Sequence, residues 1–207
     1  MPILEFEKTK TLLKKYNIPF CETEIFNSSV KALNFAKQIG FPVVLKIHSS
    51  KIFHKSEVKG VKLGINNEQE FVKAWNELAK IKDIEGILVQ KTAEGVEMVI
   101  GMKKDDQFGP VLMFGLGGIF VEVLKDVAFR VGPLNTSEAL AMIQEIKGFK
   151  LLQGYRNQKG VNINQLAKTI VQVSHLAEKE KNILAIDFNP VIGNPKSVLV
   201  VDFRIIV

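Results

Sequence analysis

Apolar residues recur at helical spacing in several parts of the chain, with lysine, glutamate and other polar residues between them. The first such segment ends at Asn17-Ile18-Pro19, because proline disfavours helical backbone in the residue before it. The pattern predicts helices over residues 4–16, from Ser28 or Ser29 to Gly40, over 68–80, from Thr136 or Ser137 to Ile146, and over 164–179.

Between these helices lie short runs of Val, Ile, Leu and Phe bounded by turn residues, which is typical of strands. The C-terminal segment indicates a hairpin with arms at 183–190 and 198–206, joined at Gly193-Asn194-Pro195. A polar, basic loop is expected over 48–60. The other strands are expected over 20–23, 41–47, 61–65, 86–90, 96–102, 111–114, 119–123 and 127–131.

The length of 207 residues allows one large domain or two small lobes, and 46% hydrophobic residues can form a substantial core. No stretch approaches the roughly 18 uncharged apolar residues of a membrane span, and the charged N-terminus does not resemble a signal peptide. The one cysteine, Cys21, cannot form an internal disulfide. We therefore expect a cytoplasmic protein with no membrane partner.

The net charge of +6 leaves nucleic acid, an anionic membrane or anionic substrates open as partners. The lysines are scattered among 22 acidic residues, and few aromatic residues lie beside them apart from Tyr155. Nucleic-acid-binding proteins usually gather their basic residues on one face, so we expect no nucleic-acid partner. Some of the positive charge could instead serve phosphate ligands.

The run from Phe108 to Pro133 combines a Gly-rich turn with charged residues in an apolar stretch. Glycine allows the backbone to approach a ligand closely. Carboxylates and an arginine beside such a turn can hold a metal and a phosphate, and a buried hairpin with a salt bridge is the alternative. The residues concerned are Gly115, Gly117, Gly118, Glu122, Asp126 and Arg130.

Lys46 nearly ends an apolar strand, where an unpaired ammonium is energetically costly. Its ammonium could be directed toward an anionic ligand or could simply reach solvent at a strand edge. His54 lies in the polar loop, where a histidine is either solvated or acts as a base, metal ligand or phosphate acceptor.

Two further groups carry polar side chains at strand ends. Gln90, Lys91 and Glu97 surround a turn and could bind a purine and a ribose, although spacing alone favours an ordinary exposed turn. Asp187 and Asn189 point to one face of a strand, and Asp202 lies on the returning arm of the same hairpin. Such oxygen ligands suit Mg²⁺; the alternative is a set of solvent-facing strand positions.

Together these residues resemble the ATP-grasp β subunit, or β domain, of ADP-forming acyl-CoA synthetases of the acetate–CoA ligase type, which are related to succinyl-CoA synthetase. The resemblance extends from about Leu4 to Val207. Its motifs, in chain order, are HKS at 54–56, FGPVLMFGLGGIFVE, DVAFRVGPL, LLQGYR, IDFNP and VVDFR.

The resemblance implies an α+β, ATP-grasp fold in which two lobes clamp ATP or ADP with Mg²⁺. The single domain, 1–207, would comprise an N-terminal helix at 1–19, an N-terminal lobe at about 20–90 and a C-terminal lobe at 91–207. The nucleotide-binding residues would be Lys46 at the phosphates, Gln90, Lys91 and Thr92 at the adenine, Glu97 at the ribose, and Gly117 and Gly118 in the Gly-rich turn.

The resemblance also implies the catalytic parts. Asn189 and Asp202 would hold Mg²⁺ with Asp187 beside them, Arg130 would contact the transferred phosphate, and His54 would relay phosphate. An α subunit with CoA-binding domains would be the partner in a hetero-oligomer, and a CoA thioester and phosphate would be the substrates. The reaction would be acyl-CoA + ADP + phosphate ⇌ acid + CoA + ATP.

Several positions depart from the family pattern. Lys59 replaces a glycine, so a positive φ there would carry an energetic cost. Asn157, Asn162 and Ala185 replace a glycine, an acidic residue and a glutamate, respectively. These departures keep open a non-catalytic or regulatory nucleotide-binding homologue, and an ATP-grasp carboxylate–amine ligase is a second alternative. The HKS loop argues against the second, because such ligases need no phosphate-carrying histidine.

Overall fold

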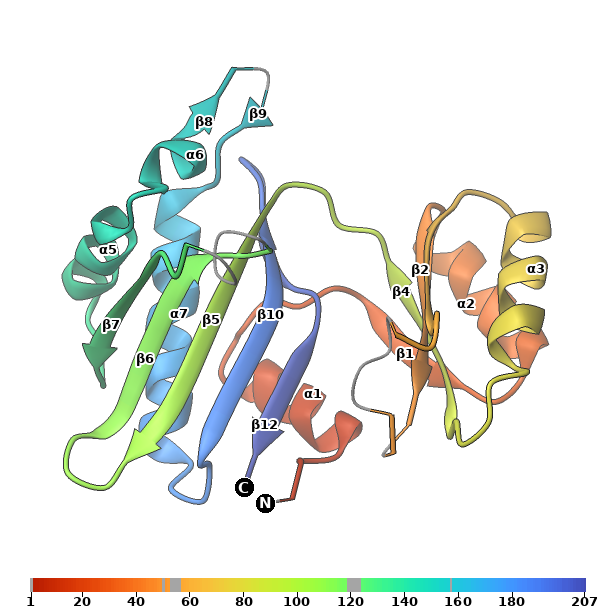
Figure 1. The fold of residues 1–207 in the computed structure, drawn as a ribbon, viewed down its shortest axis with the longest axis horizontal. Helices are drawn as coiled ribbons and strands as arrows, with labels where there is room; N and C mark the ends of the chain where they lie inside the picture. Colours follow the sequence, from red (N-terminus) through yellow and green to blue (C-terminus); the bar gives the residue numbers. More distant parts are fainter. Residues whose placement is uncertain (1, 50, 53–56, 119–123, 157) are drawn as a thin grey trace. The chain divides into compact units, whose positions relative to one another are not determined.

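The structure is a computed structural model that describes residues 2–49, 51–52, 57–118, 124–156 and 158–207. The chain divides into two compact units (Figure 1). Unit 1 comprises residues 1–20 and 93–207, and unit 2 comprises residues 21–92. No helix in the described ranges has the length and apolar character that a membrane span requires.

Unit 2 is a four-stranded antiparallel sheet in the order β1-β4-β2-β3, with two helices on one face. Alternate residues of β2 and β4, such as Leu45, Ile47 and Val89, pack against these helices. The elements are β1 (Thr23–Phe26), α2 (Ser29–Ile39), β2 (Val43–His48), β3 (Val61–Ile65), α3 (Glu68–Leu78) and β4 (Gly86–Lys91).

Unit 1 contains a larger sheet in the order β11-β10-β5-β6-β7, with β12 also paired to β10. All the pairings are antiparallel. The strands are β5 (Val96–Asp105), β6 (Gly109–Leu116), β7 (Val127–Val131), β10 (Ala185–Gly193), β11 (Val198–Val200) and β12 (Phe203–Ile206).

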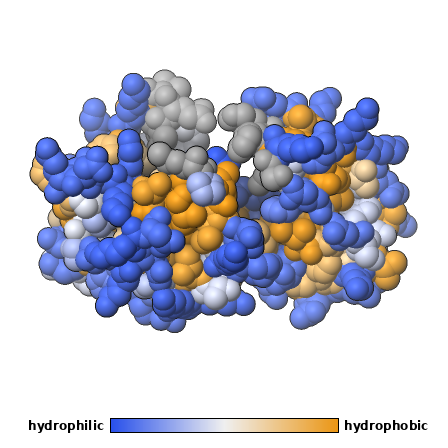
Figure 2. Space-filling view, turned by 90° about the horizontal axis from the view of Figure 1, so that it is seen from below, coloured by the Kyte–Doolittle hydropathy of each residue, from blue (hydrophilic) through white to orange (hydrophobic). Residues whose placement is uncertain are grey.

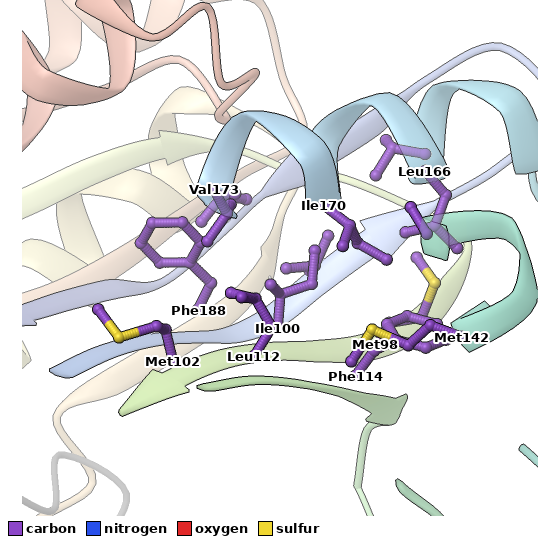
Figure 3. Close-up of a cluster of buried hydrophobic side chains, with 14 of the residues drawn as sticks. Met98, Ile100, Met102, Leu112, Phe114, Met142, Leu166, Ile170, Val173 and Phe188 are labelled. Carbon is purple, nitrogen blue, oxygen red and sulfur yellow. The ribbon is translucent and has the colours of Figure 1, made fainter. Parts of the chain in front are cut away.

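Helices α5 (Thr136–Glu145) and α7 (Ile163–Lys179) cover one face of this sheet, and α1 (Phe6–Lys15) packs beside β12. Side chains of β5, β6 and β10 point toward α7 and Met142 of α5 (Figure 3). This helix-covered face is the core of the unit, because Ile100, Phe114 and Phe188 are fully buried there. The other face of the sheet is called the outer face below.

Several boundaries differ from the expected ones. The first strand lies at Thr23–Phe26, not at 20–23, and the last strand is divided in two around Asp202. Asn135, not Thr136 or Ser137, caps α5, because its side chain accepts the Glu138 N–H in a reciprocal capping box. The pattern missed α6 (Phe149–Gln153), β8 (Gly154–Tyr155) and β9 (Gln158–Lys159). The expected strand at 119–123 lies outside the described residues.

The structure shows the local conformation at two positions that depart from the family pattern, Lys59 and Asn162. Lys59 has a φ of 55°, so the positive φ anticipated at this non-glycine position is present. Left-handed backbone costs about 1–2 kcal/mol for such a residue. Asn162 caps α7, its side chain accepting the Gln165 N–H at 3.0 Å. Asn and Asp are about equally good caps, so the missing acidic residue does not weaken this helix start.

Candidate functional site

The sheet register of unit 1 places Asp187 and Asn189 on the outer face. Their neighbours along β10, Ile186 and Phe188, are buried beneath the helices. Asp187 and Asn189 lie on the opposite face, as alternation along a strand requires, and each keeps part of its surface exposed. The expected pairing of these two side chains on one face is therefore present in the structure.

Asp202 reaches the same place from the gap between β11 and β12. The Asn189 N–H donates to the backbone oxygen of Asp202 at 3.1 Å. The Asp202 carboxylate accepts the Phe203 N–H, also at 3.1 Å. This arrangement brings the three predicted metal ligands together within one hairpin.

The pKa of Asp187 depends on its burial and on two charged neighbours in this hairpin, Arg204 and Asp202. Partial burial raises the pKa of Asp187 above its usual value; the Arg204 guanidinium opposes this rise and the Asp202 carboxylate adds to it. The described residues include no group of three or more His, Cys, Asp or Glu that could hold a metal alone. Two carboxylates and an amide nevertheless fit Mg²⁺, which usually completes its shell with water and substrate phosphates.

A cavity of about 920 Å³ opens at the other end of β5, and its volume suits a small-molecule ligand. Glu97, Gly117 and Gly118 line it. A Cβ on Gly117 would lie 3.1 Å from the Glu97 backbone, so a larger residue there would displace the strand that carries Glu97. The structure thus brings the expected ribose ligand and the Gly-rich turn to one cavity.

Two lysines that the sequence analysis missed, Lys159 and Lys196, also line this cavity. Lys159 lies in β9 and Lys196 in the turn between β10 and β11. Neither lies in a conspicuous motif. Only the folded structure shows that both come to the cavity that Glu97 lines.

In unit 2, Lys46 and Gln90 share the sheet face opposite α2 and α3. The Cα of Lys46 pairs with that of Leu88, and Gln90 pairs with Val44 on one side and Thr23 on the other. Lys46 is 8% exposed and Gln90 is 1% exposed. A largely buried ammonium beside a buried amide is an arrangement that can bind an anionic ligand with a polar ring.

Cys21 is buried just before β1, and the charge of Lys46 acts on it. Burial raises the pKa of the Cys21 thiol to about 11, although the charge of Lys46 opposes the rise. Lys91, by contrast, points to the other face, where its ammonium donates to the carbonyls of Gly40 and Phe41 at 2.6 and 3.3 Å. The backbone N–H groups of Lys91 and Thr92 donate to the carbonyls of Glu22 and Pro42, at 3.0 and 3.3 Å.

The structure does not bring Arg130 to the predicted metal ligands. Arg130 pairs across the sheet with Leu112, which pairs in turn with Met102 and then Ile186. These three side chains are all buried on the helix-covered face. Its guanidinium pairs with Glu145 at the end of α5. The register therefore separates Arg130 from Asp187 by the thickness of the sheet.

Three other residues that the sequence analysis singled out are not part of this group: Asp126, His54 and Glu122. The Asp126 carboxylate accepts the N–H groups of Lys147 and Gly148, each at 2.7 Å, and so anchors the start of α6. Its role in the structure is to hold this segment. His54 and Glu122 lie outside the described residues.

Comparisons with known proteins place these features in context. Residues 2–207 match the model of a family described as an ATP-grasp domain. The acetate–CoA ligase [ADP-forming] I subunit beta of Pyrococcus furiosus is 43% identical, over 99% of this chain and 91% of that protein. Acetate–CoA ligase [ADP-forming] II of Archaeoglobus fulgidus is 44% identical over the whole chain, which spans only 30% of that longer protein.

Solved structures agree with this result. The dinucleotide-forming acetyl-coenzyme A synthetase 1 of Ca. Korarchaeum cryptofilum, in complex with coenzyme A, Ca-AMPCP and HgCl⁺, superposes with a TM-score of 0.92 at 42% identity, covering 97% of this chain and 91% of that one. A second structure of that synthetase, with Mg-AMPPCP, has its phosphohistidine segment pointing towards the nucleotide-binding site; its TM-score is 0.88 at 42% identity, covering 99% and 92%.

Proposed function

This chain belongs to the ATP-grasp domain family, and we propose that it is the nucleotide-binding β subunit of an ADP-forming acid–CoA ligase. The observation that carries the proposal is that the predicted ribose and metal ligands lie on the outer face of the six-stranded sheet. That one face presents Glu97 at a ligand-sized cavity and gathers Asp187, Asn189 and Asp202 farther along the same strands.

In this proposal, Asp187, Asn189 and Asp202 hold Mg²⁺, which would offset the negative charge of the nucleotide phosphates. Glu97 accepts hydrogen bonds from the ribose hydroxyls, while Gly117 and Gly118 let the backbone approach the ligand. Unit 2 supplies Lys46 to the phosphates, and Gln90 and the backbone at 91–92 to the adenine. The protein's contribution to phosphoryl transfer is then mainly positioning and electrostatics.

The proposed net reaction is acyl-CoA + ADP + phosphate ⇌ acid + CoA + ATP, with phosphate carried on histidine. His54 takes part in the relay, since a neutral imidazole is a competent nucleophile near pH 7. The relatives support this reaction, because they are named as ADP-forming acetate–CoA ligases.

Turnover requires a partner, which we propose to be an α subunit with CoA-binding domains. The chain matches nine-tenths of a subunit named beta but only three-tenths of a longer relative. Figure 2 shows hydrophobic areas interrupting the hydrophilic surface of unit 1. Among the described residues of this unit, Phe108, Leu124, Phe129 and Val131 are more than half exposed, as an apolar contact surface requires.

Reconstitution tests the proposal. The purified chain is expected to bind ADP in the presence of Mg²⁺ by calorimetry, and to form ATP from acyl-CoA, ADP and phosphate only after the α subunit is added. His54→Asn should abolish ATP formation by the complex and leave ADP binding intact. Failure of the chain to bind nucleotide would refute the proposal, and turnover by the chain alone would refute the need for a partner.

A further inference from the structure

Arg204 lies beside the metal ligands, on the outer face. It belongs to β12, and its Cα pairs with that of Asp187 on β10. Side chains directly opposite each other on antiparallel strands have Cβ atoms about 4.5–5.5 Å apart. Arg204 is exposed, so its guanidinium can extend over the face that carries the carboxylates.

The other two arginines of the chain occupy different environments. Arg130 lies on the helix-covered face and pairs with Glu145. Arg156 lies beside Tyr155, its guanidinium 5.4 Å from the centre of that ring. Arg204 differs from both, because its charge acts on Asp187, one of the predicted metal ligands.

We propose that Arg204 binds the terminal phosphate of the nucleotide held at Asp187, Asn189 and Asp202. This inference rests on the proposed function and assigns its phosphate-binding arginine. A guanidinium offers a planar pair of donors that match two phosphate oxygens, and it keeps its charge at all working pH values.

The test compares Arg204→Gln, Arg204→Lys and a control, Lys8→Gln, by calorimetry on the full chain. Lys8 is an exposed cation on α1 that pairs with Glu5. We expect Arg204→Gln to weaken binding of ADP and ATP with Mg²⁺ at least tenfold, since the change removes charged hydrogen-bond donors to the phosphate. Adenosine binding should not change. Arg204→Lys should recover part of the loss, and Lys8→Gln should match the wild type.

A second titration, with EDTA in place of Mg²⁺, separates direct contact from an effect through Asp187. If Arg204 touches phosphate, Arg204→Gln still weakens ATP binding without metal. A loss that disappears with EDTA would overturn the proposal, because Arg204 would then act only by orienting a metal ligand. Wild-type affinity in Arg204→Gln would also overturn it. Failure of the wild-type chain to bind any nucleotide would instead refute the proposed function.

Discussion

The two faces of the six-stranded sheet are built from alternate residues of the same strands. On β10, Phe188 is fully buried beneath the helices, whereas Asp187 and Asn189, one residue away on either side, are exposed on the outer face. The helix-covered face holds the apolar core, and the outer face holds the candidate ligands. Along β10, a residue of the apolar core therefore lies directly next to a candidate ligand in the sequence, and the two point to opposite faces of the sheet.

The sheet of unit 2 repeats this division with one difference. Its helix-covered face is again apolar, with Leu45 and Ile47, but on the opposite face the polar residues Lys46 and Gln90 are buried. Mg²⁺ keeps several waters when it binds, which suits the exposed ligands of unit 1. Buried polar groups bind more strongly to a ligand that satisfies them, because the local dielectric is lower.

The largest expected effect is on the core side of β10. Phe188→Ala should lower the free energy of unfolding by about 3–5 kcal/mol, because it removes a fully buried ring and leaves a cavity. Its matched partner, Asp187→Asn, should change stability by less than about 1 kcal/mol. Urea denaturation of both variants checks this difference. Equal destabilisation would mean that the two faces are not energetically separate.

The next effect concerns the outer face alone. Asp202→Ala should weaken ADP binding in Mg²⁺ by about 10- to 100-fold, since it removes a charged metal ligand. With EDTA, variant and wild type should bind alike. Asp106→Ala, which removes an exposed carboxylate from the turn between β5 and β6, is the control. The metal assignment fails if Asp202→Ala retains wild-type affinity in Mg²⁺.

A pH-dependent effect is expected at Cys21, in unit 2. With a pKa of about 11, the Cys21 thiol stays protonated at pH 8 in the folded chain. Alkylation by iodoacetamide should therefore be at least tenfold slower than in urea, because the thiolate is the reactive form. Comparable rates in the two states, measured by mass spectrometry, would show that Cys21 is neither buried nor perturbed.

The same pKa shift affects stability in alkaline solution. Between pH 9 and about 11 the unfolded chain releases the Cys21 proton and the folded chain keeps it. The folded state then binds more protons, so the free energy of unfolding decreases as pH rises through this window. Cys21→Ala should reduce this decrease, and an unchanged pH profile would contradict the burial of the thiol.

Much of the fold could be predicted because its signals are local. Helical periodicity located α1, α2, α3, α5 and α7, and alternation placed Asp187 and Asn189 on one face. The cap of α5 was missed because three neighbouring residues, Asn135, Thr136 and Ser137, can all cap a helix. Only the reciprocal bond with Glu138 distinguishes Asn135.

The placement of Arg130 could not be predicted, because the local pattern of β7 is misleading. In Val127–Val131 the large apolar residues alternate with Ala128 and Arg130. This pattern favours burial of Phe129 and Val131. In the structure Phe129 is 55% and Val131 52% exposed, and Arg130 lies on the helix-covered side. On an edge strand such as β7, a charged residue can lie on the buried face, because its long side chain can reach solvent past the edge of the sheet.

The smallest expected effect tests this placement directly. Arg130→Gln removes an ion pair with Glu145 that is partly exposed, and such pairs contribute about 0–1 kcal/mol to stability. Nucleotide binding should stay within about twofold of wild type, because the register places Arg130 on the face opposite Asp187. Calorimetry on Arg130→Gln and Arg204→Gln, side by side, decides which arginine serves the phosphate. If Arg130→Gln weakens ADP binding and Arg204→Gln does not, the proposal for Arg204 fails and Arg130 has the phosphate-binding role that the family resemblance implies.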